Sequence, residues 1–119
     1  MATLGESESI WSHNGSTVDL YADGSRRILR YRSPRPELRR ACAEVGDTVF
    51  EGEKSGAKYV GEAAIFSCRC GRLTFPVSGR TTRNGTRIIV RGKAPKRDAS
   101  CKTVGYQTST LVFDYERHR

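Results

Sequence analysis

Polar and apolar residues alternate in short segments that are separated by turn-forming pairs. The pair Asn14-Gly15 joins residues 10–13 to residues 16–21, and Asn-Gly is the strongest short-range signal for a tight β-hairpin turn. Asp23-Gly24 repeats this signal before residues 26–32, which have the two-residue period of a strand. These three segments predict an antiparallel meander.

The segment Ser33-Pro34-Arg35-Pro36 is expected to stop the pairing, because proline has no N–H to donate and restricts the residue before it. A single helical turn is expected over residues 37–43. Further strands are expected at residues 48–53, 59–68, 72–78, 87–91 and 111–115, with Asn84-Gly85 as another hairpin turn. About seven to eight short strands without crossover helices predict an all-β fold, a small antiparallel barrel or sandwich.

The chain of 119 residues has the usual length of one domain, and no internal linker divides it. We expect residues 1–9 to form a disordered N-terminal segment, residues 10–116 the β domain, and residues 117–119 a basic tail. Only 36% of the residues are hydrophobic. A core this small needs covalent support.

Four cysteines, Cys42, Cys68, Cys70 and Cys101, supply a candidate for that support. Their spacing lacks the paired C-x-x-C knuckles of zinc sites, so we expect neither a metal nor any other cofactor. Two disulfides would place the protein in an oxidising compartment, periplasmic or secreted. The alternative is four buried free thiols in a cytoplasmic protein, and residues 1–12 contain no apolar run that would indicate a leader or a membrane span.

The positions of the cysteines leave two pairings open. If residues 64–70 form a strand, Cys68 and Cys70 point to the same face and each reaches a different flanking segment. A bond between these two would close a very small, strained ring. The remaining patterns are 42–68 with 70–101, or 42–70 with 68–101, and each bond would add on the order of 3 to 4 kcal/mol in the chain-entropy model.

Charge is the strongest surface feature. The 21 Lys and Arg residues against 13 Asp and Glu give a net charge of +8, which attracts anions. Tyr21, Tyr31 and Trp11 are near many of these cations in the sequence and could stack on bases or sugars. The candidate anion-binding residues are Arg26, Arg27, Arg30, Arg32, Arg35, Arg39, Arg40, Arg87 and Arg91.

Candidates for catalysis are few, and no residue is predicted to be catalytic. His118 lies in the terminal tail, and His13 precedes the Asn14-Gly15 turn, where we expect a turn or surface role. Glu51 and Glu53 would share one face of a strand, as paired carboxylates do, but most such pairs are solvated. The sequence contains none of the common nucleophile, phosphate-loop or zinc-protease motifs.

A resemblance to a protein family rests on three short motifs: W-x-H-N-G-S at residues 11–16, P-R-P at residues 34–36 and R-C-G at residues 69–71. The chain resembles a family of short, uncharacterised alphaproteobacterial modules that are exported and sometimes attached to caspase-like peptidase domains. The resemblance covers most of residues 10–115 and implies that Cys70 pairs with Cys101, and hence Cys42 with Cys68. It implies no activity, and no peptidase residues come with it.

The sequence therefore predicts a non-enzymatic, extracytoplasmic binding or accessory domain with a basic, anion-binding surface. Its partner would be an anionic polymer, a membrane surface or another protein. Two alternatives are a cytosolic nucleic-acid-binding β-barrel and an inhibitor of a cell-wall hydrolase or peptidase.

Overall fold

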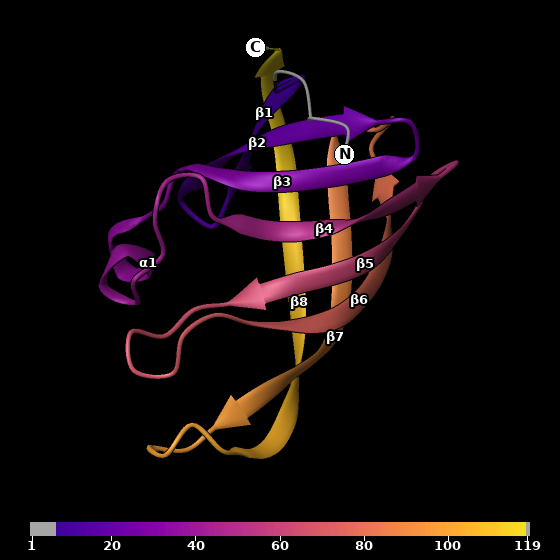
Figure 1. The fold of residues 1–119 in the computed structure, drawn as a ribbon. Coiled ribbons are helices and arrows are strands. Elements are labelled where there is room, and N and C mark those ends of the chain that lie inside the picture. The colour runs from indigo at the N-terminus through magenta and orange to yellow at the C-terminus, as the bar shows by residue number, and fades with distance from the viewer. Residues whose placement is uncertain (1–6, 119) are drawn as a thin grey trace.

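The computed structural model of the chain describes residues 7–118, which form an eight-stranded antiparallel barrel with the strands in sequence order (Figure 1). This confirms the predicted all-β fold and selects a barrel over a sandwich. The elements are β1 (Ser9–His13), β2 (Ser16–Asp23), β3 (Arg26–Ser33), α1 (Pro36–Arg40), β4 (Thr48–Ser55), β5 (Lys58–Ile65), β6 (Leu73–Thr82), β7 (Arg87–Arg97) and β8 (Thr103–His118).

The first strand closes the barrel because it pairs on both sides. In β1, Trp11 lies opposite Val18 of β2 and opposite Tyr115 of β8. The Trp11 and Tyr115 rings meet edge to face with their centroids 5.6 Å apart, an arrangement that aromatic pairs favour. Backbone pairing and aromatic packing therefore join the two ends of the sheet at the same place.

The core fills the inside of the barrel. Every second residue of each strand faces inward, and one cluster of buried side chains extends across all eight strands. Phe50, Tyr59 and Phe113 are its largest fully buried members. The same alternation places most of the charged side chains outside.

The turns largely follow the sequence. Asn14 and Gly15 both have positive φ, 49° and 87°, as a type I′ hairpin turn requires. The second turn is Gly24-Ser25, one residue later than expected, because Asp23 still pairs with Arg26. Asn84-Gly85 lies within a longer turn over residues 83–86.

The domain boundaries differ slightly from those expected. Strand β1 begins at Ser9, and Ser7 is already buried, with its Oγ 3.1 Å from the Ser9 carbonyl oxygen. Strand β8 continues to His118, so most of the expected basic tail is paired strand. Residues 1–6 of the expected disordered segment, and Arg119, lie outside the described residues.

The strand pattern was wrong around Cys68 and Cys70. Strand β5 ends at Ile65, and both cysteines lie in the loop of residues 66–72, so the argument from a shared strand face does not hold. The disulfides are Cys42–Cys68 and Cys70–Cys101, with Cα–Cα distances of 5.0 and 5.3 Å. This is the pairing that the resemblance implies.

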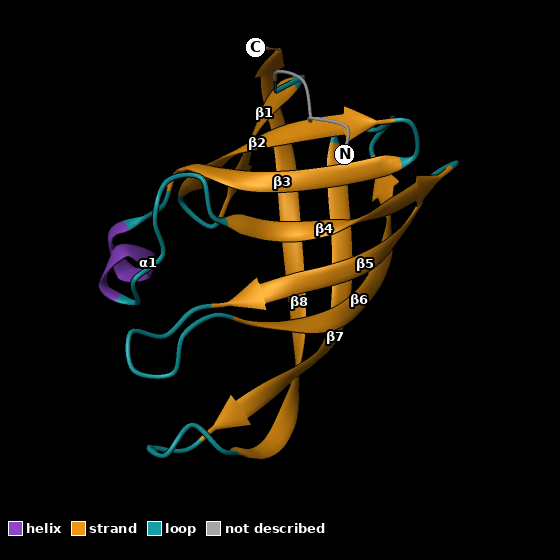
Figure 2. Cartoon of the chain, viewed as in Figure 1, coloured by secondary structure: helices purple, strands orange, loops and turns teal. Residues whose placement is uncertain are grey.

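The two disulfides connect the three longest loops in series. The first joins the β3–β4 loop, which contains α1, to the β5–β6 loop, and the second joins the β5–β6 loop to the β7–β8 loop. Figure 2 shows these three loops on the same side of the molecule. The loops at one end of the barrel are therefore cross-linked by the two disulfides.

Removing a disulfide should destabilise the fold. The bonds span 26 and 31 residues, so the double variant Cys42→Ser/Cys68→Ser should lose about 3 kcal/mol of unfolding free energy. Urea unfolding of this variant and of Cys70→Ser/Cys101→Ser under non-reducing conditions would measure both losses. An unchanged midpoint in both variants would contradict the structural role of the bonds.

Glycine is required where strands β4 and β5 approach most closely. Gly52 and Gly61 lie directly opposite each other, and a Cβ on Gly61 would overlap the carbonyl oxygen of Glu51. Gly61→Ala should therefore lower the unfolding free energy by about 2 kcal/mol or more, as overpacked sites do. Gly105 has no atom within 4 Å of its would-be Cβ, so Gly105→Ala is the matched control and should change stability little.

Candidate functional site

The nine arginines expected to bind anions do not form one surface. Arg26, Arg30 and Arg32 alternate on the outer face of β3, whereas Arg27 faces a cavity at the barrel end opposite the disulfides. Arg35, Arg39 and Arg40 surround α1, and Arg87 and Arg91 lie on β7. The structure therefore divides the expected cluster into separate groups.

Five of the nine lie within ion-pair distance of a carboxylate. The closest are Arg26 with Glu51 and Arg87 with Asp114, each at 2.7 Å. The others are Arg32 with Asp19, and Arg35 and Arg40 with Glu37. Much of the charge at these positions is balanced within the chain.

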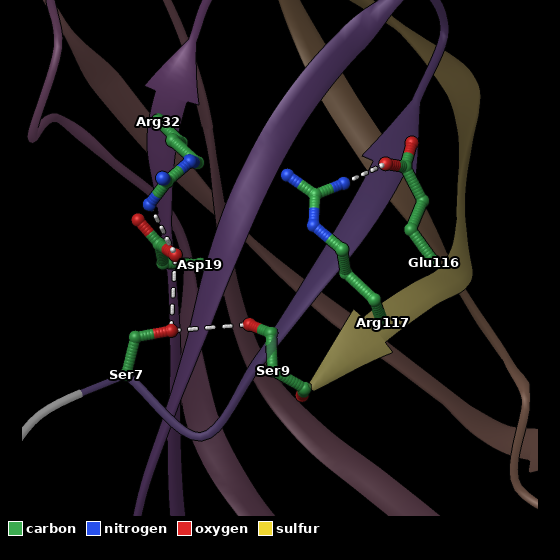
Figure 3. A network of polar contacts seen from close by, with 6 residues as sticks. All are labelled: Ser7, Ser9, Asp19, Arg32, Glu116 and Arg117. Atoms are coloured by element: carbon green, nitrogen blue, oxygen red, sulfur yellow. Dashed lines mark hydrogen bonds and ion pairs between the residues drawn. The ribbon is translucent and has the colours of Figure 1, made fainter. Parts of the chain in front are cut away.

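Arg32 belongs to a polar network between β2, β3 and the start of the described chain (Figure 3). Its guanidinium lies 3.5 Å from the Asp19 carboxylate, and the Ser7 hydroxyl donates to the same Asp19 oxygen at 3.0 Å. Asp19 is buried. A buried carboxylate needs such partners, so Arg32 has a structural role.

Two of the three aromatic residues expected to stack on nucleotides are buried. Trp11 and Tyr31 are each only 4% exposed because they face the barrel interior. Tyr21 lies on the outer face, but the Arg30 guanidinium is 5.3 Å from its ring centre, in a cation–π contact. The expected stacking surface does not exist in this form.

A compact group of cations does occur on the outer face of strands β5, β6 and β7. Lys58 lies directly opposite Arg80, and Arg91 is the diagonal neighbour of Arg80 across the β6–β7 ladder. We call Lys58, Arg80 and Arg91 the β5–β7 patch. Lys58 and Arg80 were not expected as site residues, because only the register of the strands brings them beside Arg91.

The cations of the β5–β7 patch have one acidic diagonal neighbour, Glu53 across the β4–β5 ladder from Lys58, and its carboxylate accepts from the Ser25 hydroxyl. No ion pair of the described residues includes any of the three patch cations. The outward-facing carboxylate on the same strand, Glu62, is four residues from Lys58, or about 13 Å along the strand. Like charges directly opposite in an antiparallel pair destabilise the sheet, so the patch costs the fold stability.

The patch lines a groove. A cavity of about 480 Å³ is bounded by its three cations and by Ser78, Gly79, Thr82 and Ile89. A second cavity of about 330 Å³ adjoins it and shares Ser78 and Arg91. The β6–β7 ladder ends at these two residues, and the groove continues where the strands separate.

His13 is a core residue and not the surface residue that its place before a turn suggested. It is 7% exposed and stacks on Phe113 with ring centres 4.4 Å apart. Its Nδ1 lies 2.8 Å from the Val112 carbonyl oxygen, which can only accept, so Nδ1 is protonated and donates. Burial lowers the pKa of His13, and the nearby Arg35 charge lowers it further.

The remaining candidates for chemistry are occupied by structural contacts. Glu51 pairs with Arg26, and the Ser25 hydroxyl donates to Glu53. Burial raises the pKa of Tyr59, which Arg27 opposes. Within residues 7–118, no group of His, Cys, Asp and Glu could hold a metal ion, and no helix is long and apolar enough to cross a membrane.

Comparisons of the chain with protein-family models, with curated proteins and with solved structures find no match. The candidate sites are therefore argued from their own geometry. They are the β5–β7 patch and the barrel mouth beside His13 and Arg35.

His13 makes stability depend on pH. Because its pKa is lowered from 6.5 in the folded protein, the unfolded chain binds a proton more readily below that pH. The unfolding free energy should thus be highest above pH 6.5 and fall as the pH drops, with a slope of at most about 1.4 kcal/mol per pH unit from this group. Urea unfolding at several pH values should show a smaller slope for His13→Gln than for the parent protein, and equal slopes in the two proteins would contradict the prediction.

Proposed function

We propose that this chain is a non-enzymatic binding module of an oxidising, extracytoplasmic compartment that binds a linear anionic polymer along the β5–β7 patch. The observation that carries the proposal is the pair of like charges, Lys58 opposite Arg80, with Arg91 beside it and no ion pair from any of the three to a carboxylate of the described residues. Such an arrangement weakens the sheet on its own. A bound polyanion would remove that repulsion.

The shape of the site supports a linear partner. The two adjoining cavities share Ser78 and Arg91 and follow the line along which β6 and β7 separate. Hydroxyls of Ser78 and Thr82 add hydrogen-bonding groups beside the cations. An extended chain of regularly spaced anionic groups would make several of these contacts at once.

Binding through charge, without base stacking, is also consistent with the buried aromatic residues. Trp11 and Tyr31 point into the core, so their rings offer no platform for nucleobases. The patch supplies cations and hydroxyls, which interact with the sulfates, phosphates or carboxylates of a polymer backbone. The favoured partner is therefore a polyanion that binds through the charged groups of its backbone.

The compartment is inferred from the disulfides. Both bonds connect loops at one barrel end, and such bonds persist in oxidising environments and are rare in the cytosol. The paired carboxylates of β4, Glu51 and Glu53, are engaged by Arg26 and Ser25. These contacts favour a binding role over an enzymatic one.

The proposal predicts a local effect of the patch on polyanion affinity. The variant Arg80→Gln/Arg91→Gln should bind heparin roughly three- to tenfold more weakly, because each exposed charge contact contributes up to about 1 kcal/mol. The slope of log affinity against log salt concentration should also decrease. Isothermal titration calorimetry at several salt concentrations measures both.

A matched variant separates the patch from net charge. Arg30→Gln/Lys102→Gln removes the same two charges at positions where the described residues form no carboxylate ion pair. Its heparin affinity should change much less than that of the patch variant. Equal weakening in the two variants would mean that net charge alone binds the polymer, and the patch would be discarded as a site.

A further inference from the structure

The barrel mouth at the disulfide end contains a cavity that is separate from the β5–β7 patch. Its volume is about 310 Å³, at the lower end of the range for small-molecule sites. Its polar lining includes His13, Tyr31 and Arg35, and its apolar lining includes Leu38 and Phe66. Two of the motif segments, residues 11–16 and 34–36, thus meet at this cavity.

Arg35 is held in place from both sides of its backbone. Its N–H donates to the hydroxyl of the buried Ser16 at 2.8 Å, and its carbonyl accepts from the N–H groups of Leu38 and Arg39. The side-chain stem lies over the turn glycine, Gly15, whose would-be Cβ is 3.8 Å from the Arg35 Cδ. The backbone of Arg35 and the stem of its side chain are therefore fixed beside the cavity.

The Arg35 guanidinium has unused hydrogen-bonding capacity. Its Nε is buried and has no hydrogen-bond partner among the described residues. The nearest carboxylate oxygen, on Glu37, is 3.8 Å away, which is too far for a hydrogen bond. A buried donor without a partner is costly, so a shift of the Arg35 side chain that brings a ligand's anionic oxygen within reach of Nε would be favourable.

The groups beside Arg35 suit an anion. Burial raises the pKa of Tyr31 to about 12, with Arg35 lowering it and the Asp47 carboxylate raising it, so its hydroxyl keeps its proton and can donate. The Arg35 charge lowers the pKa of both Tyr31 and His13, which places the guanidinium near both rings. The neutral His13 ring uses Nδ1 on the Val112 carbonyl oxygen.

The rest of the cavity is apolar. Val49, Phe75 and Leu111 form its floor and are each less than 10% exposed. Leu38 and Phe66 pack against the core from the two loops that Cys42–Cys68 joins. A ligand here would bury an apolar body while its charged end meets Arg35.

We propose that this mouth binds a small monocarboxylate with an apolar body, whose carboxylate is held by the Arg35 guanidinium and the Tyr31 hydroxyl. Charge-assisted hydrogen bonds from arginine are strong and directional, and the apolar walls of the cavity would pack against the body of the ligand. Glu37 at the rim, 57% exposed, opposes the incoming charge. This site is independent of the β5–β7 patch, which lies outside the barrel wall.

The test uses octanoate as the probe and the full chain with its disulfides intact. Titration followed by NMR should shift the signals of Phe66, Leu111 and other cavity residues, and octanol, which has the same chain but no charge, should bind at least about tenfold more weakly. Arg35→Gln should weaken octanoate binding at least about tenfold. Lys102→Gln, which removes one positive charge from the same barrel end at a residue that does not line the cavity, should leave it nearly unchanged.

A second variant keeps the proposal testable if Arg35→Gln perturbs folding. Glu37→Gln removes the opposing charge and should tighten octanoate binding, whereas Arg80→Gln/Arg91→Gln should not affect it. The proposal is overturned if octanoate leaves the cavity signals unshifted, if octanol binds as well as octanoate, or if Glu37→Gln weakens binding. If Arg80→Gln/Arg91→Gln loses heparin binding and retains octanoate binding, the two sites are separate.

Discussion

Closure of the sheet through the β1–β8 ladder is the constraint on which the rest of the structure depends. Successive strands of a closed meander alternate in direction, so every second connection must lie at the same end. The β1–β2 turn and the three long loops therefore share one mouth. Closure also pairs β1 with β8, which buries His13 against Phe113 and places the motif residues around Arg35. The position of the cavity and the position of the disulfide-linked loops both follow from this topology.

A single-layered barrel wall separates two chemistries along each strand. In β7, Ile88 and Val90 face the core while Ile89 and Arg91 line the outer groove. Most of the outer arginines near β3 are balanced by carboxylates on neighbouring strands, whereas the cations of the β5–β7 patch form no ion pair within the described residues. Since proximity in sequence does not distinguish these cases, the register of adjacent strands decides which cations remain available to a partner.

Much of the fold could be predicted because its signals are local. Alternation and the Asn14-Gly15 pair identified the first hairpin, and strand count predicted the architecture. The end of β5 was missed because its apolar run continues into Phe66, which leaves the strand but still packs near Tyr31, with ring centres 5.8 Å apart. The site residues were harder, because Lys58, Arg80 and Arg91 become neighbours only through two ladders, and the burial of His13 depends on a strand about a hundred residues later.

The small core explains why disulfides cross-link the loops at the barrel mouth. Only 36% of the residues are hydrophobic, and most of the large ones fill the barrel, which leaves the long loops few apolar contacts. In place of a larger core, disulfides fix the positions of Leu38 and Phe66, and backbone hydrogen bonds fix Arg35. A mouth already ordered in this way loses little conformational entropy when it binds a ligand. The covalent framework that compensates for a thin core would thus also raise the affinity of the cavity it surrounds.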